Sequence, residues 1–141
     1  MIALALLLAA PRHYLDDAKG RIHASGNRVA QVENWRDNAR DCTSSFELVR
    51  EGATTVRWTI DWKRVRNVQI STRKHFMTDV EETRYHEQPG LIFYGRNTTS
   101  AILPDGAKVE FDNLEFFLKD VTQMDYAYTG IRDHARACRR R

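Results

Sequence analysis

Residues 55–62 read TVRWTIDW, and the fold that we expect follows from their pattern. Its apolar residues occur at every second position: Val56, Trp58, Ile60 and Trp62. Successive side chains of a β-strand point to opposite faces of the sheet, so this spacing gives one apolar, aromatic face and one polar face. We therefore predict a half-buried strand in which Trp58 and Trp62 share the inner face.

Segments of similar character lie on both sides of this strand. Alternating or short apolar runs occur at 46–48, 65–70, 76–85, 91–94, 99–103, 107–111 and 114–118. Pro104-Asp105-Gly106 is a strong turn signal between two of them. Short connections between neighbouring strands favour antiparallel pairing. We expect an α+β, mostly β domain, built as an antiparallel barrel or a strongly bent sheet of about 6–8 strands.

Two segments have the spacing of amphipathic helices, with apolar residues at every third or fourth position. The first, 28–42, predicts a shorter helix before the sheet and carries Val29, Val32, Trp35, Ala39 and Cys42. The second, 120–139, carries Val121, Met124, Tyr128, Ile131, Ala135 and Cys138. We predict that this C-terminal helix closes the sheet.

Two runs carry a resemblance to a known fold. TVRWTIDWKRVRNVQI (55–70) and LEFFLKDVTQMDYAYTGIRDHARAC (114–138) resemble the second and third strands, and the last strand with its capping helix, of pleckstrin-homology-like domains of exported bacterial proteins. The resemblance implies a barrel plugged by a helix. Its lipid-binding members have a basic loop between the first two strands, but residues 50–54 contain one basic residue, so phosphoinositide binding is not implied. The alternative is a helix-grip fold similar to START-like domains, which implies an apolar ligand cavity.

The N-terminus and the cysteines both suggest export. Residues 1–10, MIALALLLAA, are too few to span a bilayer as a helix, but they suit the apolar region of a signal peptide. We predict a signal peptide over 1–11, a linker or poorly ordered arm over 12–27 and one globular domain over 28–141. Exported proteins commonly keep structural disulfides, so we also predict a Cys42–Cys138 bond and a periplasmic or secreted location, with no transmembrane segment.

The positive charge of the chain has two candidate sources of function. The net charge is +3, and Arg139, Arg140 and Arg141 account for it. This tail could contact a protein partner or an anionic surface, whereas nucleic-acid binding is not expected because it uses a folded basic patch. A second run contains Lys63, Arg64, Arg66, Arg73 and Lys74, and acidic residues follow it. We interpret it as support for strand pairing or, alternatively, as an anion-binding face.

No motif in the sequence indicates catalysis, a metal or a cofactor. The five histidines lack ligand spacing, and neither cysteine lies in a nucleophile motif. Asp61 is the carboxylate best placed to act as an acid, although alternation puts it on the face opposite Trp58 and Trp62. These tryptophans are either core residues or one wall of a ligand pocket. We predict a non-enzymatic, extracytoplasmic binding or interaction module; the alternatives are a carrier of a small apolar ligand and a hydrolase-type enzyme.

Overall fold

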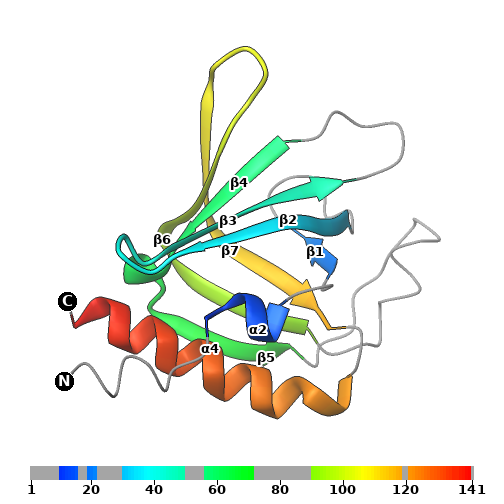
Figure 1. Cartoon of the computed structure of the whole chain (residues 1–141), viewed down its shortest axis with the longest axis vertical. Coiled ribbons are helices and arrows are strands. Elements are labelled where there is room, and N and C mark those ends of the chain that lie inside the picture. The colour runs from blue at the N-terminus through cyan, green and yellow to red at the C-terminus, as the bar shows by residue number, and fades with distance from the viewer. Residues whose placement is uncertain are drawn as a thin grey trace.

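The computed structural model describes residues 10–15, 19–21, 30–49, 56–71, 90–118 and 121–140. Most of these residues are in strands, and one long helix ends the chain (Figure 1). The strands are β1 (Lys19–Arg21), β2 (Ala30–Asn38), β3 (Thr43–Val49), β4 (Val56–Asp61), β5 (Asn67–Ser71), β6 (Gly90–Ile102) and β7 (Lys108–Phe117). The helices are α2 (Arg12–Leu15), the short 3-10 turns η1 (Trp62–Arg64) and η2 (Val121–Gln123), and α4 (Met124–Arg139).

All seven strands belong to one antiparallel sheet in the order β4-β3-β2-β1-β7-β6-β5. The long strand β6 serves two neighbours: residues 90–94 pair with β5, and residues 99–101 pair with β4. The sheet is therefore strongly bent, as Figure 1 shows, with β2, β3 and β4 fanning out above β5 and α4. The antiparallel, mostly β architecture is confirmed. The predicted barrel is not confirmed, because the sheet is not closed. Between β2 and β7 the sheet is joined only by the three-residue β1, which pairs with β2 at two positions.

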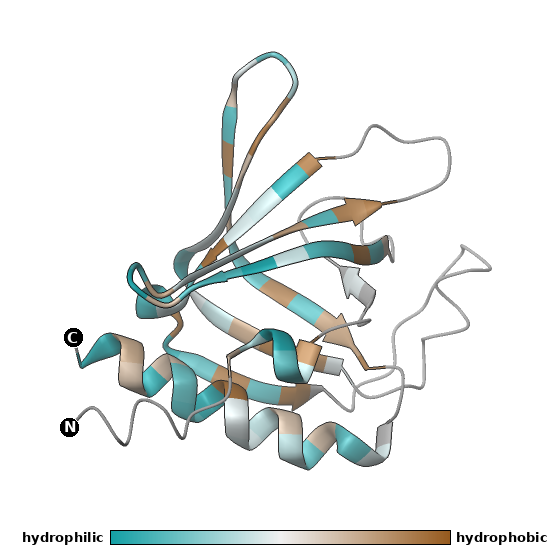
Figure 2. Ribbon diagram, viewed as in Figure 1, coloured by the Kyte–Doolittle hydropathy of each residue, from teal (hydrophilic) through white to brown (hydrophobic). Residues whose placement is uncertain are grey.

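The C-terminal helix packs on the sheet as its spacing predicts. Its buried residues are Met124, Ala127, Ile131, Ala135 and Cys138. Opposite them in the core lie large apolar side chains that are also removed from water, including Trp62, Phe46, Phe93 and Phe116. Figure 2 shows how apolar and polar residues are interleaved along these strands and along α4. The side chain of Val121 lies outside the described residues.

The predicted helix over 28–42 is wrong, because residues 30–38 form strand β2 and residues 39–42 form a turn. The error has a physical cause. Ala30 and Val32 are buried at the two-residue spacing of a strand, but the register against β3 then shifts between Glu33 and Arg36, so Trp35 is the next buried residue. A bulge inserts one residue, so the buried Val32 and Trp35 are three apart, and a spacing of three imitates the period of a helix.

Parts of the chain outside the expected sheet also form structure. Residues 12–15 and 19–21, which we expected in a linker, form α2 and β1, and Leu15 is buried in the core. The segments 99–103 and 107–111 form a hairpin. The first is continuous with 91–94 in strand β6, and the second is continuous with 114–117 in strand β7. Residues 1–9 of the predicted signal peptide lie outside the described residues. The strand predicted over 76–85 also lies outside them.

A buried polar chain joins β2, β3 and η1 beneath the helix. The Trp35 indole N–H and the Ser44 hydroxyl both donate to Oδ1 of Asp37, at 2.8 and 2.6 Å. Ser44 Oγ in turn accepts from the indole N–H of Trp62 at 2.7 Å. Because buried polar groups cost free energy unless they are paired, this chain fixes the rings of Trp35 and Trp62 in the core.

Candidate anion-binding site

The first half of the site is the turn between β4 and β5. Strand β4 ends at Asp61, so Trp62 begins η1 and does not continue the strand as predicted. The Asp61 side chain caps this turn by accepting from the backbone N–H of Lys63 at 3.1 Å. Trp62 and Val65 are both 0% exposed and anchor the turn in the core, and this leaves the side chains of Arg64 and Arg66 in solvent.

The second half is an irregular stretch of β6, where the register against β7 shifts between Tyr94 and Thr99. The backbone N–H of Arg66 donates to Tyr94 O at 2.8 Å, which brings the turn against β6. Gly95 allows this approach, because a Cβ at that position would lie 2.0 Å from Arg64 O. Asn97 follows with φ of 55°, in the left-handed region, and its N–H donates to Asp112 Oδ1 at 2.8 Å.

An open pocket of about 350 Å³ lies between these two halves, and it is lined by Arg64, Arg66, Arg96 and Asn97. Arg64 is partly neutralised, because its Nε lies 3.4 Å from Asp61 Oδ2. Among the described residues, no side chain forms an ion pair or a hydrogen bond with the guanidinium of Arg66 or of Arg96. The pocket therefore carries uncompensated positive charge.

The lining suits an oxyanion. A guanidinium presents paired N–H donors that match two oxygens of a phosphate, sulfate or carboxylate group, and it stays charged at all ordinary pH values. The side-chain amide of Asn97 can supply a further neutral donor. None of the four lining residues is a nucleophile or a general base, and the nearby Asp61 already faces Lys63 and Arg64. The four lining residues therefore offer donors that can hold an anion.

The tryptophans predicted as site residues lie elsewhere. Trp58 is buried on β4 with its ring centroid 5.4 Å from that of Phe111. Trp62 is buried against Phe93 and His134, with ring centroids 5.2 and 5.7 Å away. Both belong to the same core cluster, and neither lines the arginine pocket. Their role as a ligand wall stays a prediction.

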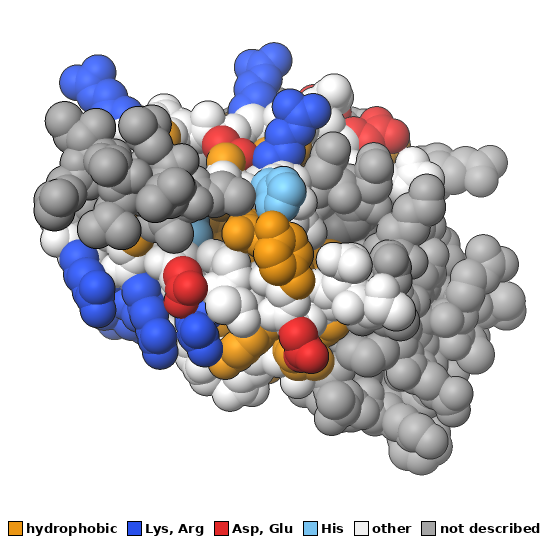
Figure 3. Space-filling view, turned by 60° about the horizontal axis from the view of Figure 1, so that its bottom comes forward, with side chains coloured by type: hydrophobic (Ala, Val, Ile, Leu, Met, Phe, Trp, Pro, Cys, Tyr) orange, Lys and Arg blue, Asp and Glu red, His pale blue; other side chains and the backbone are white. Residues whose placement is uncertain are grey.

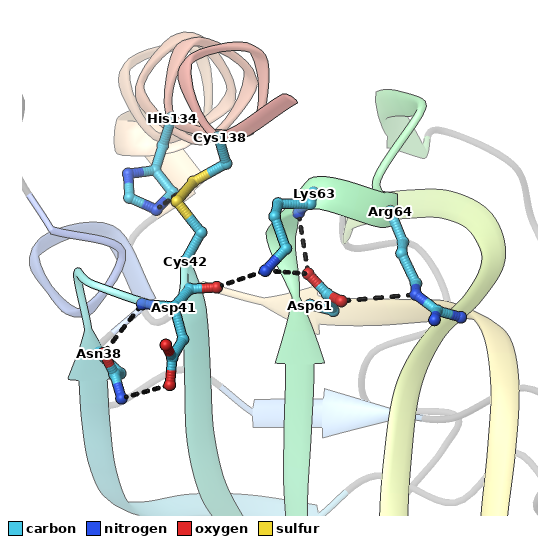
Figure 4. A network of polar contacts seen from close by, with 8 residues as sticks. All are labelled: Asn38, Asp41, Cys42, Asp61, Lys63, Arg64, His134 and Cys138. Atoms are coloured by element: carbon cyan, nitrogen blue, oxygen red, sulfur yellow. Dashed lines mark hydrogen bonds and ion pairs between the residues drawn. A yellow bond between two sulfur atoms is a disulfide. The ribbon is translucent and has the colours of Figure 1, made fainter. Parts of the chain in front are cut away.

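The predicted disulfide is confirmed and lies beside the site. Cys42 and Cys138 are joined with their Cα atoms 5.8 Å apart, so the turn after β2 is bonded to the end of α4. Figure 4 shows His134 next to this bond, with Nε2 3.6 Å from Cys138 Sγ. Lys63 Nζ donates to Asp41 O at 2.8 Å, so the disulfide turn is also bonded to η1.

The basic residues singled out from the sequence divide between several places. Arg64 and Arg66 reach the pocket; Arg73 and Lys74 lie outside the described residues. Of the C-terminal arginines, Arg139 donates from Nη1 to Val65 O, Arg140 is exposed, and Arg141 lies outside the described residues. Sequence reasoning missed Arg96 and Asn97. The one signal for them was the Gly95 interruption in an apolar strand, which is typical of a bulge or of close backbone approach.

Comparison with models of protein families, with curated proteins and with solved structures gave no match. Within the described ranges, no group of three or more histidine, cysteine, aspartate or glutamate side chains could hold a metal ion. None of the helices in the part of the chain that the structure describes combines the length and apolar character needed to cross a bilayer.

Proposed function

We propose that the protein is a binding module that takes an oxyanion group in the pocket formed by Arg64, Arg66 and Arg96. The observation that carries the proposal is the pair of guanidinium groups, on Arg66 and Arg96, that face one pocket without a described carboxylate partner. Like charges held together at a surface repel one another, and a bound anion removes that repulsion. A phosphate, sulfate or carboxylate group is the ligand that this lining supports.

The backbone around the pocket supports the proposal independently. Gly95 permits a contact that no other residue would allow, and Asn97 has a left-handed conformation that is uncommon outside glycine. A left-handed residue other than glycine costs of order 1–3 kcal/mol, and such residues concentrate at binding sites. Both lie in the segment that sets Arg96 opposite Arg64 and Arg66.

We place this module outside the cytoplasm, and we retain the pleckstrin-homology-like resemblance as part of the proposal. The disulfide fits an oxidising compartment, and the apolar residues 1–10 fit an export signal. A bent antiparallel sheet with a C-terminal helix supports the resemblance, whereas the sheet is not closed into the barrel that the resemblance implies. We favour anion binding over an apolar-ligand carrier because the described pocket is lined by cations and not by Trp58 or Trp62.

Isothermal titration with inorganic sulfate and with inorganic phosphate tests the proposal. We expect saturable binding of one anion by the full chain, weakened at least about tenfold in R66Q/R96Q, because each charge-assisted hydrogen bond contributes about 1.5–3 kcal/mol. The matched control is R36Q/K108Q, which removes two exposed cations from β2 and β7. Absence of saturable binding by the wild type, or an equal loss in the control, would contradict the proposal. Circular dichroism checks that all variants are folded.

A further inference from the structure

The C-terminal end of α4 adjoins the arginine pocket. Arg139 donates a hydrogen bond to the carbonyl of Val65, the residue between the two pocket arginines Arg64 and Arg66. The neighbouring Cys138 is bonded to Cys42, so two contacts fix this end of the helix beside the turn. The end of the helix that carries basic residues therefore lies beside the turn that carries Arg64 and Arg66.

The exposed side of this helix carries a stripe of arginines. Arg132, Arg136 and Arg140 follow one another at four-residue spacing, which puts them on one face of the helix over about 12 Å. Arg132 pairs with Asp133, whereas Arg136 and Arg140 are exposed and have no side-chain partner among the described residues. Figure 3 shows Lys and Arg side chains gathered on the left of this face, the side on which the helix ends.

We infer that the protein binds a linear acidic polysaccharide, with one sulfate, phosphate or carboxylate group in the arginine pocket and the following groups along Arg140 and Arg136. The inference rests on the proposed function and names its ligand class. A single small anion fills the pocket but leaves the helix stripe unused. A polysaccharide with regularly spaced anionic groups neutralises both the pocket and the helix stripe. Each arginine that it contacts releases counterions from the polysaccharide.

Two other polyanionic partners fit the surface less well. A membrane-binding face combines basic residues with apolar groups that enter the lipid. The large exposed hydrophobic residues among those described are Ile102, 58% exposed in the β6–β7 hairpin, and Tyr126, 55% exposed. Tyr126 lies about 21 Å from Arg140 along the helix axis at 1.5 Å per residue. Single-stranded nucleic acid needs exposed aromatic platforms for its bases, whereas the described tryptophans are buried and the exposed Tyr126 lies far from Arg140 along the helix.

The test uses heparin-derived oligosaccharides of increasing length as the probe, with the full, oxidised chain. We expect affinity to rise with length, and R136Q/R140Q to weaken binding of the longest oligosaccharide about tenfold or more while it binds inorganic sulfate as the wild type does. The dependence of log K on log salt should become shallower in the variant by roughly 1–2, since two counterion-releasing contacts are lost. The matched control R36Q/K108Q should change neither measurement.

The outcomes separate the two proposals. If the wild type binds sulfate but its affinity is independent of oligosaccharide length, or R136Q/R140Q has no effect, the polysaccharide inference is wrong and the pocket stands. If sulfate does not bind, the proposed function itself fails. Tighter binding to vesicles of phosphatidylglycerol, or to single-stranded DNA, than to the oligosaccharides would overturn the inference in favour of a membrane or a nucleic acid.

Discussion

Loss of the Cys42–Cys138 bond is expected to lower the free energy of unfolding by about 4–5 kcal/mol. The two residues are 96 apart in the sequence, so the bond closes the segment from the turn before β3 to the end of α4 into one loop. In the chain-entropy model, closing a loop of about 100 residues removes about 4.7 kcal/mol of conformational freedom from the unfolded state at 25 °C. For a domain of this size, that change lowers the melting temperature by roughly 10–20 °C.

Truncation of both side chains adds a smaller loss of stability in the folded state. Both cysteines are 2% exposed, and Cys42 has φ of 53° in the turn that the bond holds. The variant C42A/C138A avoids burying new hydroxyl groups, although it leaves small voids. Reduction of the wild type leaves both side chains in place and therefore isolates the effect of the bond itself.

The assay is thermal unfolding followed by circular dichroism, with and without a phosphine reductant that is added under denaturing conditions and retained. We expect a large fall in melting temperature for the wild type and no response to the reductant for C42A/C138A. A difference below about 3 °C between the melting temperatures of the oxidised and reduced wild type would contradict this prediction. It would mean that contacts of α4 already restrict the conformations of the unfolded chain, or that the bond strains the folded state.

Three further predictions concern glycine and tyrosine positions. G95A should destabilise the fold by about 2–4 kcal/mol in chemical denaturation and abolish sulfate binding, because its Cβ would lie 2.0 Å from Arg64 O; unchanged binding would contradict this. G130A should destabilise the wild type, since its Cβ would lie 2.0 Å from the Tyr14 ring, but stabilise a Y14A background by up to about 1 kcal/mol; the same sign in both would count against the contact. Burial, reinforced by Tyr126, raises the pKa of Tyr14 above its usual 10.0, so stability present below pH 10 should be lost as the pH rises further. Melting curves of Y14F should show a smaller alkaline loss than those of the wild type.

The parts of the fold that follow a simple period could be predicted from the sequence. Val56, Trp58 and Ile60 alternate on β4, and burial follows their pattern. The spacing of Ile131, Ala135 and Cys138 predicted the buried side of α4. The predicted disulfide also agrees, because each cysteine ends up on the core side of its segment. In the strand and in the helix, one local rule decides burial.

The closure of the sheet could not be predicted, because it depends on pairings between distant strands. Whether a bent sheet becomes a barrel is decided where β1 meets β2, and that contact amounts to Lys19 and Gly20 facing Gln31 and Ala30. No alternation of apolar residues around residues 19–21 predicts a strand. The arginine pocket has the same origin, since Arg66 and Arg96 meet only because β5 pairs with β6 in one register. The basic run at 63–66 suggested an anion-binding face, but Arg96, on the other side of the pocket, lies 30 residues after Arg66 in the sequence.

The irregular positions of the backbone are the ones that matter most for the proposed function. Three residues other than glycine have positive φ: Asn34, Cys42 and Asn97, among the residues that the structure describes. Asn34 lies in the bulge that made a strand look like a helix, Cys42 forms the disulfide beside the site, and Asn97 lines the pocket. Local rules fail where a sequence accepts local strain, and such strain persists when the surrounding structure enforces it. The break in periodicity around Gly95 therefore supports the proposed binding role of this segment.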